Sequence, residues 1–468
     1  MNLAYFYPVI YWNTANLIVD SASFAQLEEY DSEDEEEEEN DTDDTDNYDL
    51  DDYDECEYIE IKDAKGKIKK VKKTVDYGKI STAINRFKAY GIKVLPPDIN
   101  VSNYTFTPNE KTNTITYGLR GITRVSDDLI KDIIRNRPYT SFNDFKEKVK
   151  LNKLQLLNLI KSGAFDNLIN LTRLDLLKDF IWSTCEPKQR LTLQNMAALI
   201  SYNVIPEEME YYGKLFLFNK FLKTQKQGDN YLLNTAAINF ISNHFSVDII
   251  DNGIEIKQKV WDNLYKKAMD PMRVYLKEHS SEMLNNLNQA LFLQEWNKYC
   301  QGNISKYEMD SIGFYYHEHE LQAAASKYDD YYKLPDEPEI EYEFPAKNGA
   351  VIPIYKTHLL IGTVVDKDKT HSSISLLTPT GLVTVKIYKQ QWPLFDKQIS
   401  EKDENGIKHV KEKSWLSRGN LLMVQGIKRN ETFVLKKYKN SVYPVISKIT
   451  KVYPDGRLEF QFERIEAE

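Results

Sequence analysis

Cysteine is scarce in this sequence of 468 residues. The three cysteines, Cys56, Cys185 and Cys300, are far apart, and no pair has the spacing of a metal site or a redox motif. The sequence therefore predicts neither disulfides nor structural zinc, and it indicates a reducing, cytoplasmic compartment. The apolar N-terminus lacks a positively charged leader and a cleavage site, and Pro8 and Asn13 interrupt it. We expect neither a signal peptide nor a membrane span.

Patterns for covalent, metal or nucleotide chemistry are also missing. There is no Ser-His-Asp arrangement and no phosphate-binding glycine loop. His317 and His319 form a His-x-His pair, but no further ligands with metal spacing accompany them, so packing or polar capping is expected. Asp49 and Asp51 resemble a catalytic Asp-x-Asp pair but lie in an acidic run without an apolar strand. We interpret them as solvated charges.

The net charge of −10 is distributed unevenly along the chain. Residues 28–57 contain 20 Asp or Glu and no Lys or Arg, and we expect this run to be disordered because it repels itself and buries little apolar surface. The rest of the chain has 61 basic and 51 acidic residues, a net charge of about +10. A basic body is typical of proteins that handle nucleic acid.

Hydrophobic periodicity predicts a multidomain α+β protein, mostly helical in its N-terminal and middle regions and ending in an OB-type β-barrel. Residues 76–170 and 171–334 have helical spacing, whereas residues 351–468 contain short β-branched runs divided by turns. The expected parts are an aromatic segment at 1–27, the acidic insert with a lysine-rich hairpin at 28–75, helical regions at 76–170 and 171–334, a linker at 335–350 and the β domain at 351–468.

The β domain is the most basic part of the chain. Between residues 355 and 448 there are 17 Lys or Arg and 8 Asp or Glu. OB barrels bind single strands by stacking bases on aromatic rings beside a cationic groove. The candidate contacts are therefore basic or aromatic residues: Lys386, Tyr388, Trp392, Arg418, Lys428, Arg429, Lys436 and Tyr438.

Several phrases resemble, in order, the bacterial DNA polymerase III alpha subunit of family C. They are YFYPVIYWNTANL, AYGIKVLPPDINVS, ITYGLRGITRVSDDLIKDIIRNRPYTSFNDF, LLNLIKSGAFDNL and YEMDSIGFYYHEHEL, and the β domain follows where that family has its OB fold. The resemblance covers residues 1–25, 78–170 and 305–440. It implies a fingers segment at 1–27, the end of the fingers and a helix-hairpin-helix module of the clamp-binding region at 76–170, and the OB domain.

The resemblance also implies that the catalytic palm, with its aspartates and Mg²⁺, belongs to another chain, so this chain has no catalytic residues or cofactor and is inactive alone. A split, phage-encoded polymerase is the expected arrangement, acting in the bacterial host cytoplasm or nucleoid.

The helix-hairpin-helix candidate is GLRGITRVSDDLIKDI. Its expected contacts with the duplex backbone are Arg120, Gly121, Arg124, Ser126 and Lys131, through hairpin N–H groups, a helix N-terminus and cations. Family hairpins usually have glycines around the turn, and the RVS sequence of this chain departs from that pattern. Both phosphate contact and a packing role therefore remain open for the hairpin.

The QWPLF sequence at residues 391–395 resembles the peptide by which polymerases bind a sliding clamp. It lies inside the β domain, where Trp392 and Phe395 fit the inward face of a short helix, and a packing role is favoured. A sliding clamp is a possible partner without an assigned site.

The main hypothesis is a DNA-binding C-terminal subunit of a split replicative polymerase that positions primer-template and single-stranded template DNA. The alternative is a free-standing single-stranded DNA-binding or scaffold protein of a replisome. A third hypothesis is a regulator whose acidic run mimics DNA.

Overall fold

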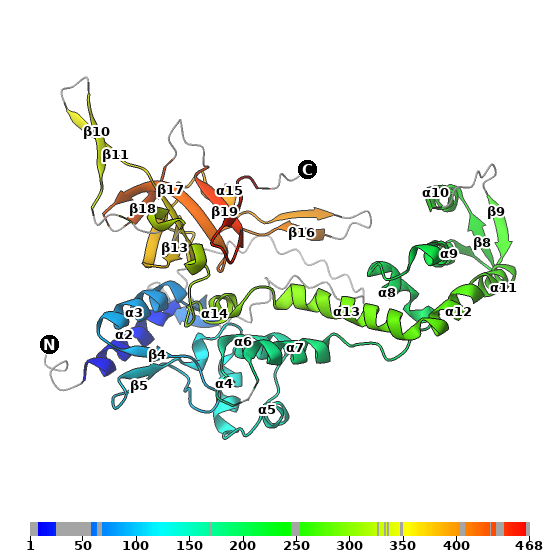
Figure 1. Ribbon diagram of the computed structural model, residues 1–468, viewed down its shortest axis with the longest axis horizontal. Helices are drawn as coiled ribbons and strands as arrows, with labels where there is room; N and C mark the ends of the chain where they lie inside the picture. Colours follow the sequence, from blue (N-terminus) through cyan, green and yellow to red (C-terminus); the bar gives the residue numbers. More distant parts are fainter. Residues whose placement is uncertain are drawn as a thin grey trace. The chain divides into compact units, whose positions relative to one another are not determined.

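The computed structural model describes residues 8–24, 58–62, 68–168, 171–244, 253–324, 327–331, 334, 337–346, 350–402, 408–430, 432–436 and 444–464. The acidic run and Tyr438 lie outside these residues. The chain forms two compact units, one made of residues 1–174 and 302–468 and the other of residues 175–301. The predicted fold class is confirmed, because helices dominate the middle of the chain and a closed β-barrel lies in its C-terminal region (Figure 1).

The first unit begins with two packed helices, α2 (Val9–Ser21) and α3 (Tyr77–Ala89). In α3 the buried side chains Ile80, Ile84 and Phe87 recur at helical spacing and form its inner face. The lysine-rich hairpin is present as the antiparallel pair β2 (Tyr58–Lys62) and β3 (Ile68–Val75), and β1 (Ala22–Phe24) pairs with the other edge of β3.

A small sheet and short helices follow α3. The sheet consists of β4 (Lys93–Leu95), β6 (Thr114–Thr116) and β5 (Thr107–Asn109), in that order. The helical elements are η1 (Leu119–Gly121), α4 (Asp127–Arg135), α5 (Phe142–Lys148), α6 (Lys153–Ser162) and the start of α7 (Arg173–Thr184). Rings of Tyr139, Phe142, Phe145 and Phe165 meet edge to face at 5.0–5.1 Å and fix α5 against the end of α6.

Helix α14 (Ile304–Ile312) packs on α6, although the two are far apart in sequence. The chain then passes through η4 (Gln322–Ala324) and η5 (Asp329–Tyr331). The segment expected to be a linker contains a strand, β10 (Ile340–Pro345), which pairs with β11 (Val351–Tyr355) as a two-stranded ribbon (Figure 1).

The barrel has the strand topology of an OB fold. Strands β12 (His358–Asp368), β13 (Ser373–Thr378), β14 (Gly381–Lys386), β18 (Thr432–Leu435) and β17 (Leu421–Arg429) are neighbours in this order, and the pairing of β17 with β12 closes the barrel. The β14–β18 pair is parallel and the other pairs are antiparallel. Alternating inward residues fill the barrel, with Trp415 and Phe433 among the fully buried side chains.

Additions surround this barrel. Helix α15 (Trp392–Asp396) lies between β14 and β17 in the chain and is followed by the hairpin of β15 (Ile399–Lys402) and β16 (Lys408–Glu412). Strands β19 (Ile446–Val452) and β20 (Leu458–Gln461) extend the sheet from β17.

The second unit is mainly helical, as expected for this region. Its elements after α7 are η2 (Leu193–Asn195), α8 (Met196–Ser201), η3 (Glu207–Met209), α9 (Glu210–Thr224), α10 (Thr235–His244), α11 (Gln258–Ala268), α12 (Asp270–Glu278) and α13 (Ser280–Tyr299). A small sheet of β7 (Lys226–Gln227), β8 (Asn230–Leu233) and β9 (Ile254–Lys257) was not anticipated. None of the described helices has the length and apolar character needed to cross a membrane.

Candidate nucleic-acid interface

The hairpin before α4 depends on a buried tyrosine. Tyr117 is fully buried, and its hydroxyl donates to the carbonyl oxygen of Ile312 at 2.8 Å. A Cβ on Gly121 would lie 2.4 Å from the Tyr117 ring, so only glycine fits there. Gly121 was predicted to contact DNA, and the structure gives it this packing role.

Arg124 occupies the position where the turn requires an unusual backbone. Its φ is +63°, in the left-handed region that favours glycine. Two residues later Ser126 caps α4, because its hydroxyl accepts a hydrogen bond from the Leu129 N–H at 3.4 Å. The RVS sequence thus forms the turn without glycine and places an arginine in it.

The next contact anchors the hairpin to the barrel. The Arg418 guanidinium donates to the Thr123 hydroxyl at 2.8 Å and to the Asp310 carbonyl oxygen at 3.0 Å, and it lies 4.1 Å from the centre of the Tyr77 ring. The Thr123 N–H donates to the Ser311 carbonyl oxygen at 2.8 Å. Arg418 was predicted as a nucleic-acid contact. Its hydrogen bonds instead join the barrel, the hairpin and α14.

The remaining hairpin candidates differ in their surroundings. The Arg120 guanidinium is half-buried and lies 5.7 Å from the Tyr104 ring centre. Lys131 is exposed and forms an ion pair with Asp128 at 2.8 Å. Asp127 and Asp128 place two carboxylates in the first turn of α4, and these repel a phosphate at that helix end. The cations of this hairpin thus lie in the turn, at Arg124, and on its flanks, at Arg120 and Lys131.

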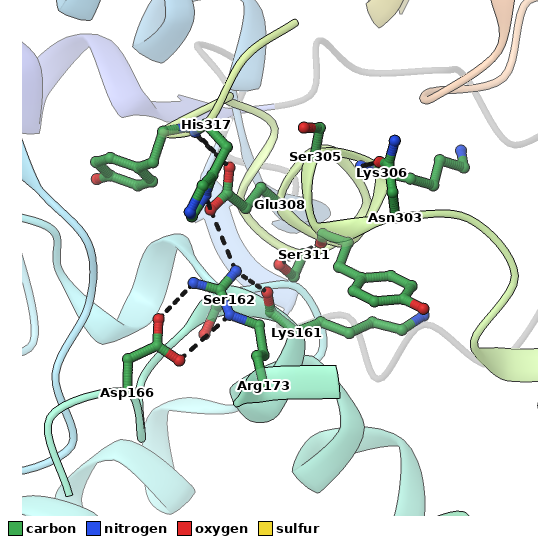
Figure 2. Close-up of polar contacts among 12 residues, drawn as sticks. Lys161, Ser162, Asp166, Arg173, Asn303, Ser305, Lys306, Glu308, Ser311 and His317 are labelled. Atoms are coloured by element: carbon green, nitrogen blue, oxygen red, sulfur yellow. Dashed lines mark hydrogen bonds and ion pairs between the residues drawn. The ribbon is translucent and has the colours of Figure 1, made fainter. Parts of the chain in front are cut away.

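A buried carboxylate holds the end of α6 to α14 (Figure 2). Glu308 is fully buried and accepts hydrogen bonds from Arg173 Nη1 at 3.2 Å, from the His317 ring at 2.7 Å, and from the backbone N–H groups of Tyr316 and His317 at 2.9 and 3.0 Å. Arg173, also buried, donates to both carboxylate oxygens of Asp166 and to the Lys161 carbonyl oxygen. The charge of Glu308 is thus compensated inside the fold.

The two histidines of the His-x-His pair point to different partners. His317 contacts Glu308, whereas His319 Nε2 donates to the Leu377 carbonyl oxygen of β13 at 2.9 Å and its Nδ1 accepts from the Leu321 N–H at 3.0 Å. Burial lowers the pKa of His319 to about 4. The contacts are those of the polar capping role expected for the pair. Within the described part of the chain, no group of three or more His, Cys, Asp or Glu is arranged to hold a metal ion.

Part of the outer barrel surface is covered by the chain itself. Val365 and Leu377 form a small apolar cluster with Met309, against which Tyr77 also packs. The start of α3 lies on β13, where a Cβ on Gly78 would be 3.1 Å from the Ser375 hydroxyl. OB folds bind oligonucleotides on the face of their second and third strands, here β13 and β14. The chain thus covers part of that face, and the exposed residue of its two strands is Lys386, at the accessible end of β14.

The accessible end contains two of the predicted contacts. Lys386, the last residue of β14, is exposed, and Tyr388 two residues later is 51% exposed. Arg429, a third predicted contact, is exposed at the end of β17, which β18 separates from β14. A base can therefore reach the Tyr388 ring, and Lys386 supplies a cation two residues before it in the chain.

The structure removes one aromatic candidate. Trp392 is 5% exposed, packs in the barrel core, and donates its indole N–H to Asp396 at 3.1 Å. Its ring offers no free face to a base. Phe395 also packs against this core, in agreement with the inward face predicted for the QWPLF helix. Lys428 and Lys436 are half-buried, and Tyr438 lies outside the described residues.

Sequence reasoning missed the residues that connect these surfaces. Glu308 and Arg173 were not singled out, and Thr123 was passed over as part of the hairpin. A signal for Glu308 was present, because it stands between Tyr307 and Met309 in a short helix whose neighbours are almost all buried. A carboxylate in such a setting requires buried partners.

Comparison with known proteins agrees with this geometry. A family model described as a helix-hairpin-helix motif matches residues 91–176. The entire chain aligns, with 35% identity over 485 positions, to the probable DNA polymerase YorL of Bacillus subtilis (strain 168) and to the DNA-directed DNA polymerase of Bacillus phage SPbeta. The chain spans about a third (34%) of the length of these two relatives.

A shorter stretch has further relatives. Over 97 residues, 19% of this chain, it is 42% identical to 8% of the DNA polymerase III alpha subunit of Borreliella burgdorferi. This chain is also 33% identical, over 96 residues, to the DNA polymerase III alpha subunit of Chlamydia trachomatis. The chain therefore carries a helix-hairpin-helix motif and is homologous to DNA polymerases, with alpha subunits of DNA polymerase III among them.

Proposed function

We propose that this chain is a DNA-binding part of a replicative DNA polymerase, which holds primer-template DNA on the hairpin before α4 and single-stranded template at the accessible end of the barrel. The observation that carries the proposal is the junction at Arg418. Its hydrogen bonds to Thr123 and Asp310 fix the barrel to the hairpin, so both surfaces belong to one compact unit. A fixed spacing between the hairpin and the barrel end suits a DNA substrate that changes from duplex to single strand along its length.

Charge and homology support the same function. The β domain has 17 basic and 8 acidic residues between 355 and 448, and electrostatic attraction to phosphates supplies most sequence-independent affinity. The relatives that align with the entire chain are named as DNA polymerases. Hairpin contacts to phosphates and stacking on Tyr388 would position DNA without reading its sequence.

The catalytic palm, in this proposal, is supplied by another chain of a split, phage-type polymerase, together with the Mg²⁺ that phosphoryl transfer needs. The complex would act in the bacterial cytoplasm, where the DNA is, and a sliding clamp would be a further partner without an assigned site.

The test is primer extension with this chain alone, with a palm-bearing chain from the same genome alone, and with the mixture. Extension that requires the mixture supports the proposal. Extension by this chain alone would show that the palm is not supplied separately. DNA binding without any stimulation of a palm-bearing chain would favour the alternative, a free-standing single-stranded DNA-binding or scaffold protein.

A further inference from the structure

The unit formed by residues 175–301 contains an open groove of about 910 Å³. One wall is the segment 189–194, which leads into α8, and the other is the turn where α12 ends and α13 begins. The volume is in the range of small-molecule binding sites, about 300–1,000 Å³. The hairpin and barrel surfaces described above do not include any of these residues.

The groove is cationic. Arg190, Arg273 and Lys277 line it, and none of the described lining residues carries a carboxylate. The Arg273 guanidinium is held in place by a hydrogen bond to the Lys266 carbonyl oxygen at 2.7 Å and by an ion pair with Asp270, which is not a lining residue. Arg190 and Lys277 are exposed, and neither side chain has an ion pair or hydrogen bond to another described residue. Their charges are available to a ligand.

Neutral donors add to these cations. The hydroxyls of Ser280 and Ser281 and the amides of Gln189 and Gln194 line the same groove. Hydroxyls and amides of this kind commonly donate to phosphate oxygens, and arginine and lysine supply the charge. The set of side chains fits an anion with several oxygens.

The floor is apolar and well supported. Leu276 is 3% exposed and belongs to the core cluster of this unit, against which Leu191 and Leu193 also pack. The polar residues therefore stand on a packed base, which reduces the ordering cost of binding. Leucine side chains can contact sugars but offer no ring on which a base would stack.

From these observations we infer that the groove binds the phosphodiester backbone of a single-stranded nucleic acid. An open groove admits a continuous strand, and no described lining residue is aromatic, so recognition would act through phosphate and sugar without sequence preference. The inference rests on the proposed function, since it adds a second contact with the DNA that the chain binds.

The experiment measures binding of a fluorescent oligothymidylate to the full chain by anisotropy as a function of salt. The double variant Arg190→Gln with Lys277→Gln is compared with a control, Lys220→Gln with Lys223→Gln. The control removes the same charge from exposed lysines of α9 that do not line the groove. Each phosphate contact on a single strand contributes about 0.7 to the slope of log affinity against log salt. We expect the groove variant to lose about 1.4 from the slope and the control to resemble wild type.

Equal slopes for the groove variant and wild type, or equal losses in both double variants, would overturn the inference. A second measurement adds ATP as a competitor for the bound oligothymidylate. If ATP displaces the strand from wild type but not from the groove variant, the groove is a nucleotide site and the assignment to a strand is wrong. Failure of wild type to bind any DNA would instead refute the proposed function.

Discussion

Replacing Arg124 by glycine separates the backbone strain of the hairpin from its charge. Arg124 has φ +63°, and a left-handed conformation costs a residue with a Cβ about 1–2 kcal/mol. Glycine removes this cost but adds about 0.5–1 kcal/mol of entropy to the unfolded chain. Arg124→Gly should therefore stabilise the fold by up to about 1 kcal/mol, whereas Arg124→Ala keeps the strain and should not.

Both substitutions remove the same cation. If Arg124 contacts one phosphate of duplex DNA, each variant should lower the slope of log affinity against log salt by about 0.9. Stability is measured by urea unfolding and affinity by anisotropy with a primed duplex. The two variants should thus differ in stability and agree in affinity, a combination that a purely structural residue does not produce.

Asn203 offers a matched control, because it is exposed and also has a positive φ, +53°. Asn203→Gly should leave DNA binding unchanged. The reasoning is refuted if Arg124→Gly and Arg124→Ala are equally stable, or if both keep the wild-type salt slope.

Three further predictions concern Glu308, Asp366 and Tyr388. Glu308→Gln should destabilise the protein by about 2–4 kcal/mol in urea, because it leaves the buried Arg173 undercompensated, while the exposed control Glu318→Gln should have little effect. Burial, with a smaller effect from Asp76, raises the pKa of Asp366 to about 6. Because the folded state therefore favours the protonated carboxyl, the free energy of unfolding should decrease as the pH rises from about 4 to about 6. Asp366→Asn should remove that fall and stabilise the protein at pH 7.5 by about 1–2 kcal/mol in thermal or urea unfolding; an unchanged pH profile would contradict this. Tyr388→Ala should weaken single-strand binding by about 1–3 kcal/mol in anisotropy titrations, and an effect as large on duplex DNA would count against stacking.

The elements with a regular pattern could be predicted from the sequence. Helix α3 followed from Ile80, Ile84 and Phe87, and its end followed from Gly91, which has a φ of +66°. The barrel followed from alternating β-branched runs. These features depend on neighbours within a few residues, so local spacing contains the information.

The site could be predicted only in part, because its decisive contacts are non-local. Arg418 and Thr123 are 295 residues apart, and nothing in the spacing of a basic residue shows whether it will meet a hydroxyl or a phosphate. Trp392 had two competing interpretations, and burial in the barrel core decided between them. The strand β10 was hidden in a Pro- and acid-rich segment, whose composition indicated a linker.

The most direct test of the account is equilibrium binding of the full chain to a primed duplex with a single-stranded template overhang, titrated with salt and compared with the duplex and the single strand alone. The account predicts that the primed substrate binds more tightly than either part, with a salt slope larger than that of either part, since the hairpin and the barrel end would bind it together. Equal affinity for all three substrates, or no salt-dependent binding, would contradict it.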